Sequence, residues 1–513
     1  MSAFKNAVNN NNTTRNQNRA YTANGGATLA SSLNPLVDMF FMIGSLRTKD
    51  LGQYKAQFDA AFEANPTLAL QMILWARDIR GGAGERNTPR ELLKYLEVKS
   101  PESVLKVIPV LAEFGRWDDL LIFKTSAAKT LAYTQIAEAL RAGNGLCAKW
   151  MPRVYKFKKN AQGVVDMNTT ANKNRANNNN IARDIMKVMG INERQYRKLL
   201  SSLSNTVEQK MCANEWDSIE YGKLPSVASS RYLPAFMKRD EARYRSYLSS
   251  LEKGEAKVNA ATLFPYDVLK NLVATGNYYN RQRPTAEQVR LGIQQWEALT
   301  NLMGDNRILP MVDTSGSMSG YNVTPKLTVQ DVAVSLGLYV STKQTGAFKD
   351  LWLNFSTSPK LKQLPAGDIS VKANDLYNNH GSDWDGSTDV GAAFDLVLST
   401  AVKQNVPQSE MPKVLMIFSD MEFNGSGGRN WNKTAFEVAK QKFERAGYEL
   451  PTVVFWNLNA RANNNPVRFD EAGTALVSGF SPNVIPAILS GDAVDPVSIM
   501  LAAIDTPRYR VLG

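Results

Sequence analysis

The sequence predicts a multidomain protein in which an all-helical part is followed by an α/β part built on a doubly wound, mostly parallel sheet. Three observations support this fold class. The chain has 513 residues, more than one ordinary hydrophobic core accommodates. Apolar residues recur at three- and four-residue steps from about 44 to 302, the period of a helix. After about 303, short β-rich apolar runs alternate with amphipathic helices.

Two segments are rich in asparagine. Residues 1–30 have almost no periodic apolar pattern and are predicted to be a flexible arm. Residues 168–180, with the sequence NTTANKNRANNNN, are predicted to be an exposed loop that interrupts the helices. The helical domain is therefore expected to span residues 31–302.

In the helical part, polar residues before proline mark several predicted helix starts. Asn65, Thr88 and Ser100 each offer an N-cap side chain, followed by proline at the first helical position. Glu91 is spaced to complete a capping box with Thr88. Since no repeat of fixed period is visible, a solenoid of HEAT type is a hypothesis about architecture, whereas the helical content follows from the periodicity.

The α/β part is predicted to span residues 303–513. Strands are expected at 308–312, 351–355, 414–418 and 452–456, and helices at 328–342, 388–402 and 433–446. This alternation predicts a Rossmann-like, doubly wound parallel sheet. In such sheets ligands bind at the carboxyl ends of the strands, so functional residues are expected there.

The net charge of +12 is concentrated in the helical part. Residues 1–300 hold 42 Lys and Arg against 27 Asp and Glu, whereas residues 301–513 hold 18 against 21. Residues 151–200 alone carry 11 basic and three acidic side chains. This local excess indicates a polyanionic partner such as a nucleic acid. A merely solvated surface is the alternative.

The cysteines and the apolar runs indicate in which cellular compartment the protein is expected. Cys147 and Cys212 occur in no C-x-x-C pattern, which argues against a disulfide framework or a cysteine-based zinc site and fits a reducing cytoplasm. The most apolar early run, residues 36–46, contains Asp38 and is too short to span a bilayer. The N-terminus has no apolar signal segment. We therefore expect a cytoplasmic monomer with no membrane association.

The first predicted strand of the α/β part leads into the segment D-T-S-G-S, residues 313–317. Asp313, Ser315 and Ser317 provide oxygen atoms, which suit Mg²⁺ or Mn²⁺ better than zinc or copper. Asp420 ends the predicted strand VLMIFSD, and Thr388 opens a predicted helix. All five residues are candidate metal ligands. Alternatively, the serines cap a helix and the aspartates are solvated strand ends.

This arrangement of residues resembles the metal-ion-dependent adhesion site of von Willebrand factor A domains. The resemblance implies that Asp313, Ser315 and Ser317 are ligands from a first loop, Thr388 from a second and Asp420 from a third. It implies that Mg²⁺ is bound directly or through water. It also implies an open coordination position that accepts a carboxylate from a partner protein.

A catalytic function is the weaker interpretation of these acids. Asp313 and Asp420 suit a two-metal phosphohydrolase, but no general base is evident. His380, the only histidine, is predicted to be an ordinary loop residue, which argues against serine and cysteine nucleophile schemes. We therefore expect no enzymatic activity. Three further acids of the second loop are expected to solvate it or to support the ligands: Asp383, Asp385 and Asp389.

Two sets of basic residues in the helical part are interleaved with aromatic residues. The first surrounds Trp150, Tyr155 and Phe157 and consists of Lys149, Arg153, Lys156, Lys158 and Lys159. The second surrounds Tyr196 and consists of Arg183, Lys187, Arg194, Arg197 and Lys198. This mixture can hold phosphates and stack on unpaired bases. Tyr155 and Tyr196 fit a helix core equally well.

The glycine-rich segment between Arg80 and Arg86 could be taken for a phosphate-binding loop. No G-K-[ST] follows it and the preceding segment is helical, so a tight turn between two helices is the better prediction. Arg80 and Arg86 are candidates to face RNA. Alternatively, ion pairs hold the turn, formed by Arg77 and Arg86 with Asp78 and Glu85.

Three segments are similar to landmarks of the TROVE module of the Ro autoantigen family: ARDIRGGAGER (76–86), FGRWDDLL (114–121) and WDSIEYGKLPSVA (216–228). With the later segments SDMEF, VVFWNL and ALVSGF, about 90% of the chain looks closest to an uncharacterised TROVE-like family with a fused von Willebrand A domain.

The resemblance to the TROVE family implies a ring of HEAT-like repeats closed by the A domain. It implies that structured small noncoding RNA binds the basic outer surface and that single-stranded RNA ends bind in the central hole. A Mg²⁺-dependent protein adaptor is the alternative, and a metal-dependent phosphohydrolase a weaker one. The asparagine-rich segment departs from the Ro pattern, which leaves the identity of the RNA open.

Overall fold

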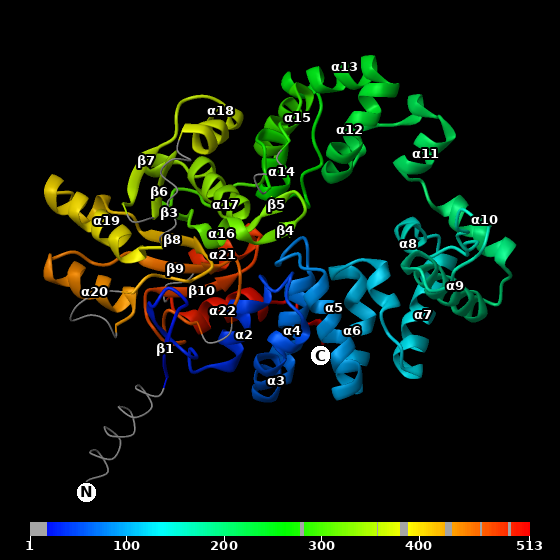
Figure 1. The fold of residues 1–513 in the computed structure, drawn as a ribbon, viewed down its shortest axis with the longest axis horizontal. Helices are drawn as coiled ribbons and strands as arrows, with labels where there is room; N and C mark the ends of the chain where they lie inside the picture. The colour runs from blue at the N-terminus through cyan, green and yellow to red at the C-terminus, as the bar shows by residue number, and fades with distance from the viewer. Residues whose placement is uncertain are drawn as a thin grey trace, which may run out of the picture. The chain divides into compact units, whose positions relative to one another are not determined.

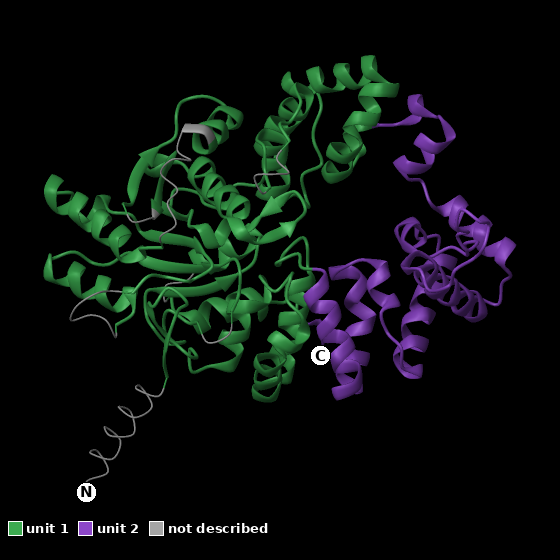
Figure 2. Ribbon diagram, in the orientation of Figure 1, with its two compact units in different colours: residues 1–85, 221–510 green, residues 86–220, 511–513 purple. Residues whose placement is uncertain are grey.

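The computed structural model describes residues 18–276, 282–355, 358–379, 388–425, 433–461, 464–490 and 494–512. The chain divides into two compact units (Figure 2). The first, called here the sheet unit, comprises residues 1–85 and 221–510, and the second, the helical unit, comprises residues 86–220 and 511–513. The units do not follow the predicted boundary near residue 302, since helices from both ends of the predicted helical domain belong to the sheet unit.

The sheet unit is built on six strands (Figure 1). Their order is β10-β9-β8-β3-β6-β7, and all neighbours are parallel except the edge pair β6 and β7. The predicted α/β fold class is confirmed. The strands are β3 (Ile308–Asp313), β6 (Leu351–Phe355), β7 (Lys360–Gln363), β8 (Val414–Ser419), β9 (Thr452–Asn457) and β10 (Thr474–Ser478).

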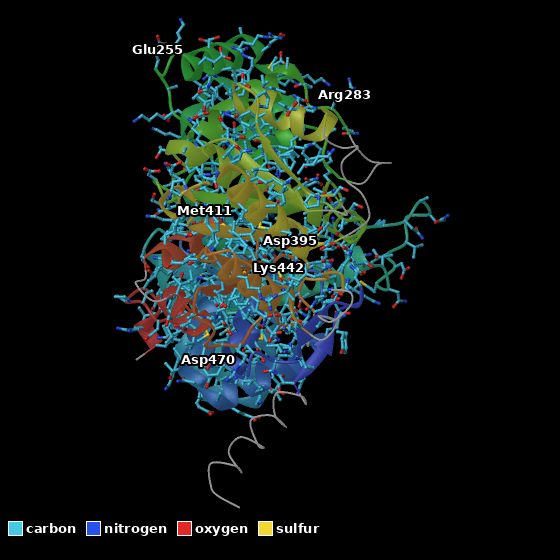
Figure 3. The ribbon with its side chains drawn as sticks, turned by 90° about the vertical axis from the view of Figure 1, so that its left-hand side faces the viewer. Glu255, Arg283, Asp395, Met411, Lys442 and Asp470 are labelled. Carbon is cyan, nitrogen blue, oxygen red and sulfur yellow. The ribbon has the colours of Figure 1, made fainter. Side chains whose placement is uncertain are left out.

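Helices cover this sheet on both faces. Every residue of β3, β8 and β10 is buried, as expected for parallel strands between two layers of helices. The strand order reverses beside β3, so right-handed crossovers place α17 on one face and α19 and α20 on the other. These helices are α17 (Val329–Lys343), α19 (Val390–Gln404) and α20 (Ala435–Arg445). Asp395 and Lys442 form an ion pair between α19 and α20 (Figure 3).

The first helix of the chain, α2 (Pro35–Ile43), packs against β10 of this sheet. Seven of its nine residues are buried, and Asn34 caps its N-terminus. Gly44 follows the helix, and a Cβ atom there would lie 2.4 Å from the carbonyl oxygen of Ser478. Only glycine allows this close approach. The apolar run near residue 40 therefore belongs to the α/β layers.

Residues 18–30 form an antiparallel hairpin of β1 (Arg19–Tyr21) and β2 (Ala27–Leu29). The Thr22 hydroxyl donates to the carbonyl oxygen of Phe423 at 2.6 Å, and Leu29 pairs with Asn465. The prediction of a flexible arm was wrong for these residues, because their partners lie some 400 positions later in the chain. Residues 1–17 lie outside the described residues.

The remaining helices confirm the predicted all-helical character. Asn65 caps α4 as expected. In contrast, α5 begins at Asn87 and the buried Thr88 hydroxyl has no hydrogen-bond partner among the described residues, so the predicted capping box is wrong. No helix among the described ranges is long and apolar enough to cross a membrane.

The sheet unit contains α3 (Lys55–Ala64), α4 (Pro66–Arg77), α12 (Ser226–Arg239), α13 (Glu241–Glu252), α14 (Pro265–Leu272), α15 (Ala286–Glu297) and α22 (Pro496–Ile504).

The helical unit consists of α5 (Asn87–Lys99), α6 (Pro101–Phe114), α7 (Ser126–Arg141), α8 (Gly145–Trp150), α9 (Thr170–Met189), α10 (Glu193–Leu203) and α11 (Val207–Ala213). The prediction of a loop at 168–180 was wrong, because α9 begins at Thr170. Asparagine has a low intrinsic helix propensity, but tertiary contacts override it. Asn172 and Asn179 are buried on the same face as Ala182 and Met186.

Candidate metal site and nucleic-acid interface

Two of the predicted metal-binding loops meet at the carboxyl ends of neighbouring strands. Strands β3 and β8 are paired with Val312 opposite Phe418, so Asp313, the last residue of β3, and Asp420, which follows β8, lie at the same edge of the sheet. The strand order reverses at this point, which is where doubly wound sheets bind ligands. The Ser419 hydroxyl donates to Asp313 Oδ2 at 2.5 Å and joins the two loops.

The second loop is joined to the third through Asn424. The Asn424 backbone N–H donates to the carbonyl oxygen of Thr388 at 2.9 Å, and the Thr388 N–H donates to Asn424 Oδ1 at 3.4 Å. In the first loop, Ser315 Oγ lies 3.1 Å from Ser317 Oγ. Asp420 is linked to Ser317 as well, since burial raises the pKa of this carboxyl and a hydrogen bond from that serine offsets part of the rise. All five predicted ligands therefore lie on connected loops.

Several buried oxygens at these loops lack a hydrogen-bond partner within the described part of the chain. They are Thr314 Oγ1, Thr388 Oγ1 and Asp420 Oδ2. Leaving a buried polar atom unpaired costs about 1–3 kcal/mol, so such atoms in a folded protein call for a ligand or water. These are hard oxygen donors of the kind that Mg²⁺ and Mn²⁺ prefer. The donor set therefore fits the predicted metal. Thr314 was not among the predicted residues, because only its burial distinguishes it.

The two carboxylates are buried together and disfavour each other's charge. Burial and the neighbouring Asp420 raise the pKa of Asp313 to about 7. Burial also raises the pKa of Asp420, although the Glu422 backbone N–H and Arg461 oppose this effect. A divalent cation between the two carboxylates would remove this penalty.

Glu422 supports the third loop, and no local pattern of residues indicates this role. Its carboxylate is buried and accepts from the Ala23 N–H at 2.6 Å and from Asn464 Nδ2 at 3.1 Å. Met421, between it and Asp420, has a φ of 63°, which a non-glycine residue adopts only when its surroundings hold it there. The N-terminal hairpin therefore holds the loop that carries Asp420.

Of the other acids of the predicted second loop, only Asp389 lies among the described residues. Asp389 caps α19, since its Oδ1 accepts from the Ala392 N–H at 2.8 Å. His380, Asp383 and Asp385 lie outside the described residues. Among the residues that the structure describes, no three His, Cys, Asp or Glu side chains form a cluster that could hold a metal. The candidate site therefore depends on two carboxylates and on hydroxyl oxygens.

Ten of the twelve predicted RNA-binding residues lie in the helical unit between α8 and α10. None of the ten has an ion-pair partner among the described residues, and all but Arg153 are exposed. They are Lys149, Arg153, Lys156, Lys158, Lys159, Arg183, Lys187, Arg194, Arg197 and Lys198. These cations are therefore available to an external anion.

The basic segment 153–159 is extended and is held along α9 by asparagine side chains. Asn179 Oδ1 accepts from the Tyr155 N–H at 2.8 Å, and its Nδ2 donates to the Tyr155 carbonyl at 3.0 Å. Asn172 makes the same pair of bonds with Lys158, at 2.7 and 2.9 Å. The two asparagines stand seven residues apart, two turns on one helix face. Each asparagine amide bonds both the backbone N–H and the carbonyl of one residue, as a neighbouring strand would. The lysines of the segment remain exposed.

The aromatic residues near this segment divide into exposed and buried ones. Tyr155 is 45% exposed, whereas Tyr196 is fully buried and its hydroxyl donates to the Pro152 carbonyl at 3.2 Å. Burial raises the pKa of Tyr196 well above its ordinary value. The Arg116 guanidinium lies 3.9 Å from the Trp150 ring centroid. Tyr155 is therefore available to a base, and Tyr196 belongs to the core.

Residues 22–142 and 126–309 match the family model described as Domain of unknown function (DUF2828), which together is more than half of the chain. The chain belongs to this family. Residues 308–504 of this DUF2828 protein match a second model, described as Domain of unknown function (DUF7788). The two matches overlap at residues 308–309, the first two residues of β3, a few residues after the predicted start of the α/β part at 303.

Two further similarities extend over most of this DUF2828 protein. An uncharacterized protein of Acanthamoeba polyphaga mimivirus is 26% identical over 539 residues, which cover 95% of this chain and 87% of the relative. A crystal structure of the Ro protein of Deinococcus radiodurans is similar over 93% of this chain and 100% of its own, with 13% identity and a TM-score of 0.35. That TM-score is too low to equate the two folds.

The glycine-rich segment of the DUF2828 protein is a tight turn, as predicted. A Cβ atom on Gly82 would lie 1.8 Å from the carbonyl oxygen of Trp75, so the chain folds back here on glycine. The predicted ion pairs are corrected. Asp78 binds Arg508 and Tyr509, Glu85 binds Arg47, and Arg86 binds Asp118 at 3.3 Å. The partners of the two buried acids are far away in the sequence.

The last two predicted RNA-binding residues flank this turn and belong to different units. Arg80 is exposed in the sheet unit, and its carbonyl oxygen accepts from Asn483 Nδ2 at 3.2 Å. Arg86 opens the helical unit, with its side chain 52% exposed beside Asp118.

Replacing Asn179 with alanine is expected to release the basic segment. The change removes both bonds to Tyr155 and leaves its N–H and carbonyl without these partners, at a cost of about 1–3 kcal/mol. We expect faster amide hydrogen exchange across residues 153–159, measured by mass spectrometry. Asn177→Ala, an exposed residue of the same helix, is the control. Equal exchange in the two variants would show that the asparagine pairs do not hold the segment.

Proposed function

We propose that this protein binds RNA through the basic surface of its helical unit. The observation that carries the proposal is the set of ten cations between α8 and α10, none of which pairs with a described carboxylate. Unpaired surface cations repel one another, and a polyanion relieves this repulsion while releasing its own counterions. RNA supplies such a row of phosphates.

The fixed backbone of segment 153–159 favours binding further. Because Asn172 and Asn179 already hold it extended, less conformational entropy is lost when its lysines contact phosphates. The exposed ring of Tyr155 offers a stacking surface for an unpaired base. Structured small RNA and single-stranded RNA ends are the proposed partners.

We also propose that the α/β part holds Mg²⁺ or Mn²⁺. Asp313, Ser315, Ser317, Thr388 and Asp420 would hold the ion directly or through water. The ion would neutralise the buried carboxylates and offer a position to a carboxylate of a partner protein. The unpaired oxygens Thr388 Oγ1 and Asp420 Oδ2 support this assignment. The proposed role is binding, not catalysis.

Electrophoretic mobility of a structured RNA over a salt series tests the RNA proposal. Replacing Lys156, Lys158 and Lys159 together with glutamine is expected to weaken binding at least tenfold at low salt. The slope of log affinity against log salt should fall by about 2–3, because each phosphate contact contributes about 0.7–0.9.

A matched control distinguishes binding by this particular surface from an effect of the overall charge of the protein. Lys94, Lys99 and Lys106 lie on α5 and α6 of the same unit, and replacing them with glutamine removes the same charge. The control should bind RNA as the unmodified chain does. The proposal fails if the two triple variants lose affinity equally, or if the unmodified protein binds no RNA at low salt.

A further inference from the structure

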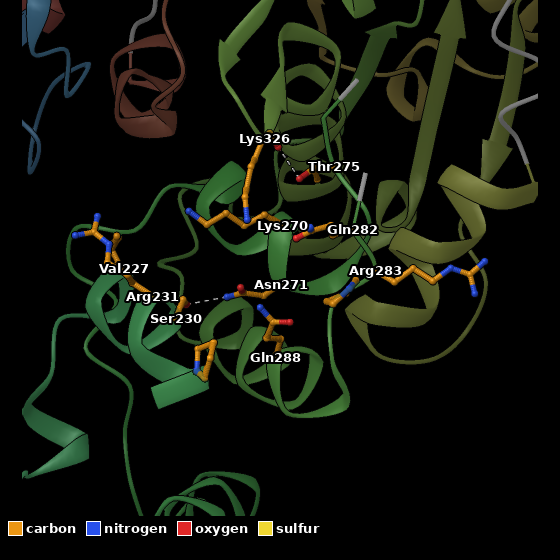
Figure 4. Close-up of a pocket in the computed structure, with 12 residues that line it drawn as sticks. Val227, Ser230, Arg231, Lys270, Asn271, Thr275, Gln282, Arg283, Gln288 and Lys326 are labelled. Atoms are coloured by element: carbon orange, nitrogen blue, oxygen red, sulfur yellow. Dashed lines mark hydrogen bonds between the residues drawn. The ribbon is translucent and has the colours of Figure 1, made fainter. Parts of the chain in front are cut away.

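A polar pocket of about 450 Å³ lies in the sheet unit among α12, α14, α15 and the turn between β4 (Asn322–Thr324) and β5 (Leu327–Thr328). Its twelve lining residues include four basic and no acidic side chains. The four are Arg231, Lys270, Arg283 and Lys326 (Figure 4). None of them belongs to the RNA-binding surface proposed above. An anionic ligand fits this lining.

The cations of the pocket are available to a ligand. Arg231, Arg283 and Lys326 are exposed, and none pairs with an acidic side chain among the described residues. Lys270 contacts Asp267 at 3.1 Å and is the one lining cation with such a partner in the described part of the chain. In Figure 4, Lys326 extends toward Lys270, while Arg231 and Arg283 lie on opposite sides of the pocket.

The wall that carries Lys326 is fixed by its backbone. The Thr275 hydroxyl donates to the Lys326 carbonyl at 2.9 Å. Gly276, with a φ of 97°, packs so closely that a Cβ atom there would lie 3.3 Å from the same carbonyl. The Gly276 N–H donates to the buried Asp331 at 2.9 Å. Lys326 therefore projects from a rigid turn.

The floor of the pocket presents one amide acceptor and one amide donor. Asn271 is 3% exposed, and its Nδ2 donates to Ser230 Oγ at 2.8 Å and to Gln295 Oε1 at 2.9 Å. The Thr285 N–H donates to Gln288 Oε1 at 2.7 Å and fixes that amide. Asn271 Oδ1 and Gln288 Nε2 take no part in these bonds and are the amide atoms that a ligand could engage.

We propose that this pocket binds a nucleoside phosphate, with its phosphate near Lys270 and Lys326 and its base against Asn271 and Gln288. Small-molecule pockets typically measure about 300–1,000 Å³, so the pocket has room for more than a lone phosphate. Asparagine and glutamine amides are side chains that hydrogen-bond to nucleobase edges, so an amide acceptor and an amide donor from two lining residues suit a base. The nucleotide is either free or the 5′-terminal nucleotide of an RNA.

Isothermal titration calorimetry of the full chain tests this proposal. The probes are AMP, GMP, CMP and UMP, the corresponding nucleosides, and hexaribonucleotides with and without a 5′-phosphate. We expect at least one monophosphate or phosphorylated hexamer to bind at least tenfold more tightly than its unphosphorylated form. The double variant Lys326→Gln/Arg231→Gln should lose at least tenfold in that affinity. Both side chains are exposed and unpaired among the described residues, so the variant should fold.

The control is Lys253→Gln/Lys257→Gln, which removes the same charge from exposed positions outside the pocket. It should bind the probe like the unmodified chain. Preference for a phosphorylated hexamer over every mononucleotide identifies an RNA end, and the reverse identifies a free nucleotide. The proposal is overturned if no phosphorylated probe binds more tightly than its counterpart, or if the pocket and control variants bind alike. The variant at Lys156, Lys158 and Lys159 should keep mononucleotide binding. The experiment therefore tests the pocket independently of the proposed RNA-binding surface.

Discussion

Replacing Glu85 with alanine is expected to lower the free energy of unfolding of the sheet unit by about 3–5 kcal/mol. Glu85 is fully buried and binds Arg47 through two bonds, at 2.8 and 3.1 Å. The Arg47 guanidinium also lies 4.6 Å from the ring centroid of Phe480. Burial lowers the pKa of Arg47, but Glu85 and Tyr266 together outweigh this effect and raise the pKa above its ordinary value. Without Glu85 a buried positive charge has lost its partner.

Chemical denaturation monitored by circular dichroism measures this effect. Glu255→Ala is the control, because Glu255 is exposed on the loop after α13 (Figure 3) and its loss should change stability by less than about 0.5 kcal/mol. The double variant Arg47→Leu/Glu85→Leu should recover much of the loss, since apolar residues of similar size can replace a buried ion pair. Equal stability of Glu85→Ala and Glu255→Ala would contradict the interpretation.

This ion pair illustrates what the sequence could not predict. Local spacing indicated the turn at 81–84, because glycine and helix-end patterns act over a few residues. The same local reasoning paired Glu85 with Arg86, whereas the structure uses Arg47, 38 positions earlier. Side-chain partners depend on tertiary packing, which a local pattern does not contain.

The asparagine-rich segment at 168–180 shows that secondary structure, too, depends on tertiary contacts that a local pattern does not contain. Composition favoured a loop, since asparagine is a weak helix former. The apolar positions Ala182, Ile185 and Met186 continue a helical face, and Asn172 and Asn179 extend that face by two further turns. The amino-acid composition of a segment does not show which of its asparagines will be buried and will bind a neighbouring backbone. The strands, and the loops that carry the candidate metal ligands, were predictable because continuous buried runs and the acids at their ends are local features.

The positions of the candidate metal ligands could be predicted from the sequence because Asp313 and Asp420 lie at or next to the ends of strands, whereas the binding of a metal there stays a prediction. Once β3 and β8 are neighbours, Asp313 and Asp420 must lie at the same edge of the sheet. The support from the N-terminal hairpin was beyond prediction, since Ala23 and Glu422 are 399 positions apart. A chain lacking residues 18–30 would therefore lose a contact of the loop that carries Asp420.

Mg²⁺ is expected to raise the thermal stability of the protein through this site. An ion that binds only the folded state adds about 2.7 kcal/mol at a concentration of 100 times its Kd. For the sheet unit, which carries the site, that corresponds to a rise in Tm on the order of 3–5 °C. Differential scanning calorimetry with Mg²⁺ and with chelator measures the rise. Asp420→Asn and Thr388→Val should abolish it, because each removes an oxygen donor that has no protein partner among the described residues.

Asp389→Asn is the matched control, because it removes a charge from the same loop while asparagine still caps α19. This variant should keep the full effect of Mg²⁺ on Tm. A nonspecific effect of the salt would persist equally in all three variants and would refute the site. RNA affinity separates the roles of the two parts. If Asp420→Asn loses the metal effect and binds RNA unchanged, the ion serves the α/β part and its protein partners, and the RNA surface functions independently of it.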